Sequence, residues 1–347
     1  MMTLKEAVKK IRPLDEKAME GAKKRWDSIA KPLHSLGELE NMLTQIAGIT
    51  GTPDVRVEKK AVVAMCADNG VVEEGVTQTG QEVTAIVAEN FLAGTTTCCV
   101  MCRQCGAELF PVDVGMVTDT KVRTDHKVAY GTKNMTKEPA MTREQAIQGI
   151  EAGIAMAEEL KGKGYQVLAT GEMGIGNTSS SSLWMTCFTG IPLDQCVGAG
   201  SGLNHQGINH KYEVLKRSLE QYPGEHSAEE ILCRFGGYEM VMAVGAMLKA
   251  AELGMVILID GFIMTNCILA ASRLYPEVMS YAIFGHQGDE SGHKLLLDYL
   301  GARPLLNLGL RLGEGSGSVC AYPIVDSAVK MLNEMDSFAH ASITKYF

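Results

Sequence analysis

The residues with the clearest chemical meaning are 171–182, where the sequence reads Gly-Glu-Met-Gly-Ile-Gly-Asn-Thr followed by four serines. The apolar residues 167–170 before them are typical of a buried strand, and residues 183–185 after them indicate a helix. A strand, a glycine-rich turn and a helix start form an anion site, because free backbone N–H groups at a helix N-terminus point at the anion. The turn has neither the P-loop lysine nor Gly-x-Gly-x-x-Gly spacing, so it suits a nucleotide monophosphate better than a triphosphate.

A second glycine turn, residues 198–203, precedes a predicted helix over residues 207–221 and offers further amide donors for the same phosphate. Lys211 lies on that helix. It either adds a positive charge to the anion site or is a solvated lysine, which is the more ordinary arrangement.

A third turn, residues 313–318, places the carboxylate of Glu314 between glycines, where small neighbours leave it open to a ligand. A glutamate in a dry cleft can have its pKa raised towards neutrality and act as a general base. A surface turn with an ordinary glutamate explains the same pattern equally well.

Five apolar segments separated by helical patterns predict an α/β fold with a parallel sheet covered by helices on both faces. Capping boxes at Thr142-x-x-Gln145 and Ser227-x-x-Glu230 open two of the helices. The predicted strands are residues 61–67, 109–114, 166–170, 255–259 and 281–284.

A polar residue stands at or just after the end of each predicted strand. In open α/β sheets ligands bind beyond the carboxyl ends of the strands, so these residues predict one shared cleft. Loop positions and helix caps are the ordinary alternative for such residues. The residues are Asp68, Asp113, Glu172, Asp260 and His286.

The two ends of the chain differ in character from the middle. Residues 1–50 are charged and helical in period, and residues 323–338 predict another amphipathic helix. We therefore expect residues 1–50 and 323–347 to form a small helical domain, and residues 51–322 to form the large α/β domain. Residues 68–81 form a long polar loop, in which Thr77 and Gln81 suit an uncharged ring, although a solvent loop is the alternative.

Composition excludes several classes of function. The net charge of −9 without a basic patch argues against nucleic acid and anionic membrane surfaces. No apolar run is expected to reach transmembrane length, and residues 1–10 are charged rather than signal-like, so a cytoplasmic location follows. The ten cysteines suggest reduced thiols. Cys98, Cys99, Cys102 and Cys105 have a local iron–sulfur-like spacing, but packing within a helix over residues 95–106 explains them better.

At several of these segments the sequence resembles the nicotinate-nucleotide:dimethylbenzimidazole phosphoribosyltransferase family, and the resemblance extends over residues 31–339. It implies transfer of phosphoribose from nicotinate mononucleotide to 5,6-dimethylbenzimidazole or a related lower-ligand base of cobamides. The products would be α-ribazole 5′-phosphate and nicotinate. It also implies a homodimer with a Rossmann-like large domain. The segments are residues 68–81, 171–178, 197–203, 256–262 and 310–316.

The resemblance also assigns roles to individual residues. Glu314 matches the general base, with Glu172 and Asp260 as acidic residues of the active site. The base-binding candidates are Thr77, Gln81 and Met173. Six residues match the family's phosphate-binding turns: Gly176, Asn177, Thr178, Ser201, Gly202 and Leu203. The turns and the following helix add Gly174, Gly200 and Lys211 as further phosphate and ribose candidates. Because backbone amides would hold the phosphate, we expect neither a metal nor another cofactor.

Two positions depart from the family pattern. His34 stands where the family's Pro-x-Gly-Ser-Leu-Gly segment has glycine, and it either lies at the active-site entrance across a dimer interface or is an ordinary surface residue. Thr77 stands where serine is common. Both leave other acceptor bases open, as well as a nucleotide-binding subunit that works only with a paralogous partner.

Overall fold

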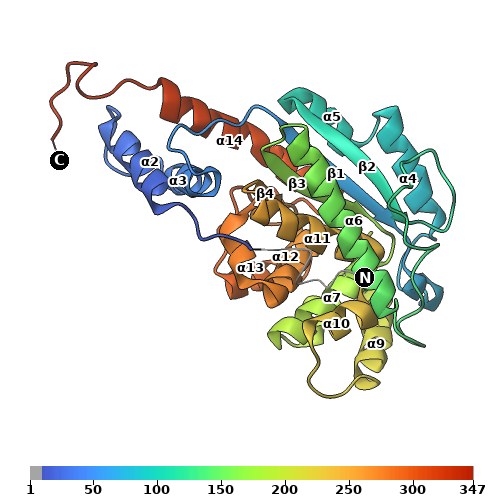
Figure 1. The fold of residues 1–347 in the computed structure, drawn as a ribbon. Helices are drawn as coiled ribbons and strands as arrows, with labels where there is room; N and C mark the ends of the chain where they lie inside the picture. The colour runs from blue at the N-terminus through green and yellow to red at the C-terminus, as the bar shows by residue number, and fades with distance from the viewer. Residues whose placement is uncertain (1–9, 347) are drawn as a thin grey trace.

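The computed structural model describes residues 10–346, so most of the charged segment at residues 1–10 lies outside the described residues. Five parallel strands form one sheet in the order β2-β1-β3-β4-β5 (Figure 1), which confirms the predicted parallel α/β fold. Each strand matches a predicted segment to within a few residues. The strands are β1 (Lys60–Ala67), β2 (Ala107–Gly115), β3 (Val167–Met173), β4 (Val256–Ile259) and β5 (Ala282–Phe284).

Helices cover both faces of this sheet (Figure 1). On one face α11 (Tyr238–Glu252) contacts four strands and packs along α6 (Arg143–Gly162), with α12 (Phe262–Leu274) beside it. On the other face lie α5 (Thr97–Cys105) and α14 (Ser316–Glu334), which pack together. The remaining elements are α2 (Glu16–Ser28), α3 (Glu38–Thr50), η1 (Gly70–Glu74), α4 (Glu82–Ala93), α7 (Asn177–Thr189), α8 (Leu193–Cys196), α9 (His205–Glu220), α10 (Ala228–Phe235), η2 (Pro276–Tyr281) and α13 (His293–Leu300).

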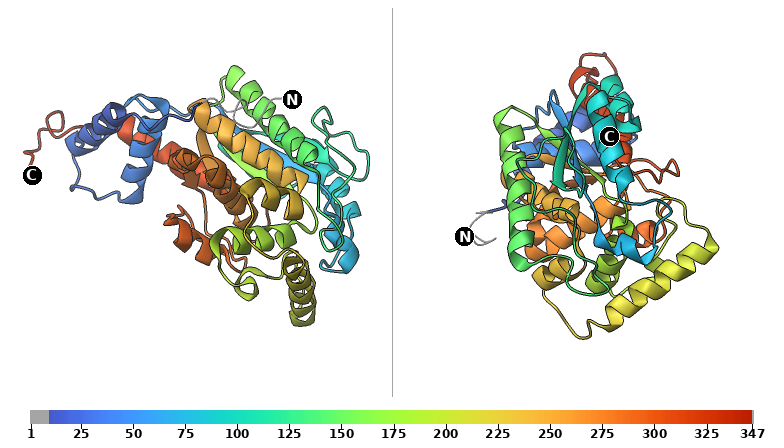
Figure 2. Two further views of the ribbon diagram at one scale, coloured as in Figure 1. Left: turned by 60° about the horizontal axis from the view of Figure 1, so that its bottom comes forward. Right: turned by 90° about the vertical axis from the view of Figure 1, so that its right-hand side faces the viewer.

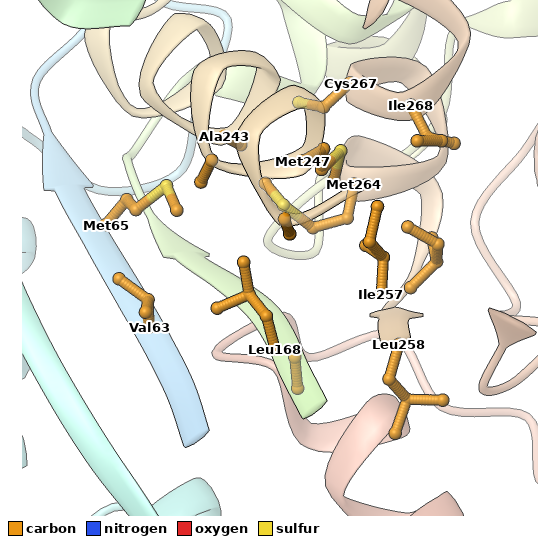
Figure 3. Close-up of a cluster of buried hydrophobic side chains, with 14 of the residues drawn as sticks. Val63, Met65, Leu168, Ala243, Met247, Ile257, Leu258, Met264, Cys267 and Ile268 are labelled. Atoms are coloured by element: carbon orange, nitrogen blue, oxygen red, sulfur yellow. The ribbon is translucent and has the colours of Figure 1, made fainter. Parts of the chain in front are cut away.

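The core between the sheet and the α11/α12 layer is built from alternating strand residues. Leu168 and Ile257 point towards the two helices, whereas Leu258 points to the opposite face (Figure 3). Met247 and Met264 pack above them (Figure 3), and all five side chains are at most 1% exposed. Because every residue of β4 is buried, the strand is continuously apolar in sequence, which is the signature of a doubly covered sheet.

The helices α6 and α11 approach closely because glycines remove side chains from their interface. A Cβ at Gly153 would lie 2.0 Å from the Met242 carbonyl oxygen, and one at Gly245 would lie 2.0 Å from the Ile150 carbonyl oxygen. Both capping boxes are confirmed at the starts of α6 and α10.

Helices from near the two ends of the chain lie together at one side of the molecule (Figure 2), where α14 packs against α3 and α3 against α2. Ile29 and Ser337 form an isolated bridge between the two ends. The predicted start of the last helix at residue 323 is wrong, since α14 begins at Ser316 and carries Pro323 in its interior. The predicted boundary was placed at Pro323 because proline favours the first turn of a helix. A helix interior can also accommodate proline, at a cost in stability.

The residues of α4 and α5 require a second correction. Residues 82–105 are long and apolar enough to cross a membrane by length and composition, contrary to the expectation from sequence. The stretch is broken at Gly94, where φ is +72° and α4 ends. Core helices of globular proteins meet the same criteria, so this finding is weak evidence for a membrane span.

The α6/α11 interface predicts that Gly245→Ala lowers the free energy of unfolding by about 1–3 kcal/mol, because the added methyl group overlaps the Ile150 carbonyl. Urea unfolding followed by circular dichroism measures the change. Gly162→Ala is the matched control, since a Cβ at that helical position meets nothing within 4 Å. We expect the control to stay within about 1 kcal/mol of the wild type, and an equally stable Gly245→Ala would contradict the packing argument.

Candidate active site

A cavity of about 390 Å³ opens beyond the carboxyl ends of β3 and β4. The glycine turns, the α7 N-terminus and the loop before α14 all contribute to its wall. The structure therefore brings together most of the residues singled out from the sequence. Those that line the cavity are Thr77, Glu172, Met173, Gly174, Gly176, Asn177, Thr178, Gly200, Ser201, Gly202, Asp260, His286 and Glu314.

The turn between β3 and α7 has the geometry expected of an anion site. Gly176 adopts φ +95° and precedes Asn177, the first residue of α7. Glycine supplies no side-chain cap to α7, and Asn177 and Thr178 line the cavity. The N–H groups of Asn177 and Ser179 donate to the carbonyls of Gly174 and Gly176, which leaves the Thr178 N–H available to a ligand. The serines after Thr178 are buried, as expected for a closely packed helix start.

Lys211 reaches this turn from α9. It is buried, so the alternative prediction of a solvated lysine is wrong. It is 1% exposed, and its Nζ donates a hydrogen bond of 2.7 Å to Thr178 Oγ1. Burial lowers the pKa of Lys211 to about 8, while attraction to Glu290 opposes the shift. The lysine lies behind Thr178 rather than in the cavity wall, so its charge reaches a ligand through that hydroxyl.

The second glycine turn completes this side of the cavity. Gly200 and Gly202 have φ +52° and +118°, which L-residues with side chains rarely adopt. A Cβ at Gly200 would lie 2.9 Å from Thr178 Oγ1, so the two turns meet. Leu203 is outside the cavity wall, and α9 begins at His205 rather than near residue 207.

Glu314 lines the same cavity and has a strained backbone. Its φ of +63° lies in the left-handed region, which is uncommon for residues other than glycine. Its N–H donates to the Glu172 carbonyl at 3.2 Å, and its Oε2 accepts from the Cys98 N–H at 3.1 Å. Gly171 permits this approach, because a Cβ there would lie 2.4 Å from the Glu314 carbonyl oxygen. Burial raises the pKa of Glu314, and the nearby Asp260 raises it further.

Glu172 is the second-last residue of β3 and is 6% exposed. Its Oε2 accepts a hydrogen bond of 2.5 Å from Asn177 Nδ2. Burial raises the pKa of Glu172 to about 8, although the Asn177 contact opposes the shift. Burial therefore favours the protonated form of this carboxyl group.

Asp260, just after β4, connects the cavity to α14. Its Oδ1 accepts from the N–H groups of Gly317 at 2.7 Å and Ser318 at 3.0 Å, and His286 Nε2 lies 3.6 Å away. The carboxylate therefore caps the helix that follows Glu314. Burial raises the pKa of Asp260, while His286 and the amide contacts oppose the shift.

Two of the acidic residues expected in the cleft, Asp68 and Asp113, do not reach it. Asp68 Oδ2 accepts from the Val117 N–H at 2.8 Å. Asp113 Oδ1 accepts from the N–H groups of Gly115 and Met116, and its Oδ2 lies 3.1 Å from Lys127 Nζ. Both side chains secure local loops, which was the ordinary alternative.

Of the two hydrogen-bonding residues predicted to bind the aromatic base, one lines the cavity and the other does not. Thr77 lines the cavity and donates to the Thr79 carbonyl at 2.7 Å. Gln81 is outside the wall, and its Nε2 donates to the Asn69 carbonyl at 3.1 Å. Gln81 therefore holds the loop that carries Thr77.

Sequence reasoning missed the buried Glu239 on α11. It is 0% exposed, its Oε1 accepts from Asn69 Nδ2 at 3.1 Å, and burial raises its pKa to about 7. A lone carboxylate at the start of an otherwise apolar helix was the available signal. Glu239 lies outside the cavity wall, whereas Glu290 and Arg311 line it and had no comparable signal in the sequence.

The cysteine cluster lies on α5, as predicted. Cys98 Sγ is 3.9 Å from Cys102 Sγ, and both side chains are buried. Among residues 10–346, no group of three or more His, Cys, Asp or Glu side chains is arranged to hold a metal ion.

Comparison with known proteins identifies the same family that the sequence resembles. A family model described as phosphoribosyltransferase matches residues 11–343. The nicotinate-nucleotide–dimethylbenzimidazole phosphoribosyltransferase of Bacteroides fragilis is 55% identical over 338 residues, which cover 96% of this chain and 97% of that protein. The chain belongs to this phosphoribosyltransferase family.

More distant family members also match over their whole length. The enzyme of the same name from Ruminiclostridium cellulolyticum is 41% identical, with 99% of both chains covered. The crystal structure of CobT from Thermus thermophilus superposes with a TM-score of 0.90 at 34% identity, covering 95% of this chain and 100% of that one. Membership of the family makes the chain an enzyme of the phosphoribosyltransferase class.

The raised pKa of Glu172 predicts a pH dependence of stability. Between its ordinary value of 4.5 and about 8, the folded protein keeps a proton that the unfolded chain releases, so the free energy of unfolding falls as pH rises. Glu172→Gln should make this slope shallower by up to about 1.4 kcal/mol per pH unit. Urea unfolding from pH 5 to pH 8 measures it.

The control for this experiment is Glu225→Gln, which alters an exposed loop glutamate. We expect this variant to keep the wild-type slope. If Glu172→Gln also keeps it, the buried carboxyl group does not hold the extra proton.

Proposed function

We propose that this chain transfers phosphoribose from nicotinate mononucleotide to 5,6-dimethylbenzimidazole or a related lower-ligand base, releasing nicotinate and α-ribazole 5′-phosphate. The observation that carries the proposal is Glu314, which lines the same cavity as the two glycine turns and has a strained backbone. Backbone strain of this kind gathers at functional sites, where the surrounding structure holds it in place. The named relatives support the choice of substrates.

In the proposed binding mode the nucleotide's phosphate lies at the two glycine turns. The amides of Thr178 and of residues 200 and 201 hold it, Thr178 donates its hydroxyl, and Lys211 supplies a positive charge behind that hydroxyl. Accepting from Lys211 leaves the Thr178 proton free to point at the ligand. The base lies against Thr77 and Met173, which line the same cavity.

In the proposed chemistry Glu314 acts as the general base. Nicotinate is a pyridinium in the mononucleotide, so it leaves as a neutral ring nitrogen and needs no general acid. The attacking nitrogen of the benzimidazole gains positive charge as its bond to C1′ forms, and Glu314 relieves that charge by taking the proton from the other ring nitrogen. Attack from the face opposite nicotinate turns a β-glycosidic bond into an α one.

The other two acids have supporting roles in this scheme. Burial holds a proton on Glu172 in the unliganded cavity, and a bound pyridinium favours its ionised form. The ionised carboxylate then stabilises positive charge on the ribose as the glycosidic bond breaks. Asp260 adds negative charge and, as a positioning residue, fixes the start of α14 after Glu314.

We further propose that the enzyme works as a cytoplasmic homodimer with a small helical domain formed by both chain ends. The contacts of α2 and α3 with each other and of α3 with α14 support the helical domain. His34 supports a role at an interface, because its side chain is 75% exposed and its backbone has φ +54°, which suits the glycine of the family pattern. Gel filtration tests the dimer, and a monomer at micromolar concentration would contradict it.

The substrate assignment predicts nicotinate release when purified protein meets nicotinate mononucleotide and a base. A panel of 5,6-dimethylbenzimidazole, other benzimidazoles, adenine and phenolics, separated by chromatography, identifies the acceptor. We expect a benzimidazole to react fastest. Failure to release nicotinate with every base would overturn the proposed reaction.

Glu314→Gln should lower kcat by about 10²- to 10⁴-fold, because the amide cannot accept the proton. Steady-state kinetics measure the loss, and circular dichroism checks the fold. The matched control is Glu138→Gln, an exposed glutamate outside the active-site cavity, which should keep wild-type kcat. Near-normal turnover of Glu314→Gln would remove Glu314 from the role of base.

Thr178→Val should mainly raise the KM for nicotinate mononucleotide, by about tenfold or more, since a hydrogen bond to a charged group is lost. The KM for the base should change little. The exposed threonine Thr79 provides the control, as Thr79→Val leaves the phosphate turns intact. An unchanged mononucleotide KM in Thr178→Val would argue against the proposed phosphate site.

A further inference from the structure

A second cavity, of about 770 Å³, lies between the start of α6 and the helix α10. It shares no lining residue with the active-site cavity. Its wall is largely apolar on one side, where Pro139, Met141 and Tyr222 contribute. The N-terminal ends of α6 and α10 border it through Thr142 and Ser227. We refer to it as the Arg234 cavity.

Arg234 lines this cavity and is only 9% exposed. Within residues 10–346 its Nε is buried without a hydrogen-bond partner, and no carboxylate forms an ion pair with its guanidinium. Its neighbours are the rings of Tyr222 and Phe235, with Cζ 5.7 and 5.8 Å from their centroids. Buried arginines are almost always paired with an anionic group. The described residues provide no such counter-ion for Arg234. Burial lowers the pKa of Arg234, because removing the charged guanidinium from water is unfavourable.

The other charges at the cavity are already engaged or lie at its rim. Arg143 Nη2 pairs with Glu229 Oε2 at 2.9 Å, which joins α6 to α10. Glu230 accepts from the Ser227 N–H at 2.8 Å as part of a capping box. Lys133 and Glu138 lie at the rim of the cavity. One buried positive charge therefore remains inside, and the two helix N-termini add partial positive charge beside it.

We propose that the Arg234 cavity binds a small monocarboxylate with an apolar body. Its carboxylate pairs with the Arg234 guanidinium, and its body lies against Met141, Pro139 and Tyr222. A single negative charge matches the one buried cation, Arg234, since Lys133, which also lines the cavity, is exposed. A phosphate dianion would bring a second charge close to Glu229 and Glu230, which line the same cavity.

The experiment uses the full chain and benzoate as the probe, with the active site first saturated with nicotinate mononucleotide. Isothermal titration calorimetry compares the wild type with Arg234→Met and with the control Arg143→Met, which removes the paired arginine at the rim. We expect benzoate to bind Arg234→Met at least about tenfold more weakly, while Arg143→Met stays within about threefold. A benzoate-soaked crystal should place the carboxylate in hydrogen-bond contact with Arg234.

Thermal unfolding separates a ligand site from a structural arginine. Without benzoate, Arg234→Met should melt at or above the wild-type temperature, because an unpaired buried charge is gone, and benzoate should no longer raise that temperature. If methionine impairs folding, Arg234→Lys gives the same comparison, since it loses the two-pronged guanidinium. Equal benzoate affinity in the variants, benzoate density only in the active site, or binding of inorganic phosphate in preference to benzoate would each overturn the proposal.

Discussion

The active site depends on a single close approach, in which the backbone at Glu314 rests on β3. Contact at Gly171 is possible only without a Cβ, and the Glu314 N–H bonds to the strand through the Glu172 carbonyl. The left-handed backbone at Glu314 costs on the order of 1–3 kcal/mol. Asp260 helps to offset that cost by capping the helix that follows. The carboxylate is therefore placed by contact with the central strand of the sheet.

The same packing makes the cavity strongly acidic in character. Burial raises the pKa of Glu172, Asp260, Glu290 and Glu314, and ionised neighbours raise the pKa of several of them further. Such a site favours positive charge inside it, because every cation restores the ionised form of a nearby carboxyl group. Reactions that develop a cation on a sugar or on a heterocycle suit this environment.

Much of the sheet could be predicted because strands buried on both faces are apolar segments in the sequence, as β1 and β4 are. The glycine turns were recognisable because positive φ at Gly176 and Gly202 favours that residue type. It was harder to predict which polar residues line the cavity. A carboxylate after a strand can turn to the cleft, as at Glu172, or bind amides of its own loop, as at Asp113. The sequence shows neither the competing amides nor the burial that hides Lys211.

The helix α14 has a consequence for any attempt to divide the molecule. It runs without a break from Gly317, held by Asp260 at the active site, to the region where α14 packs on α3. Residue 322 lies inside it, so a truncation there would remove most of the helix that follows Glu314. The terminal helices therefore cannot be exchanged between relatives as an independent module without carrying along the helix that Asp260 caps beside the cavity.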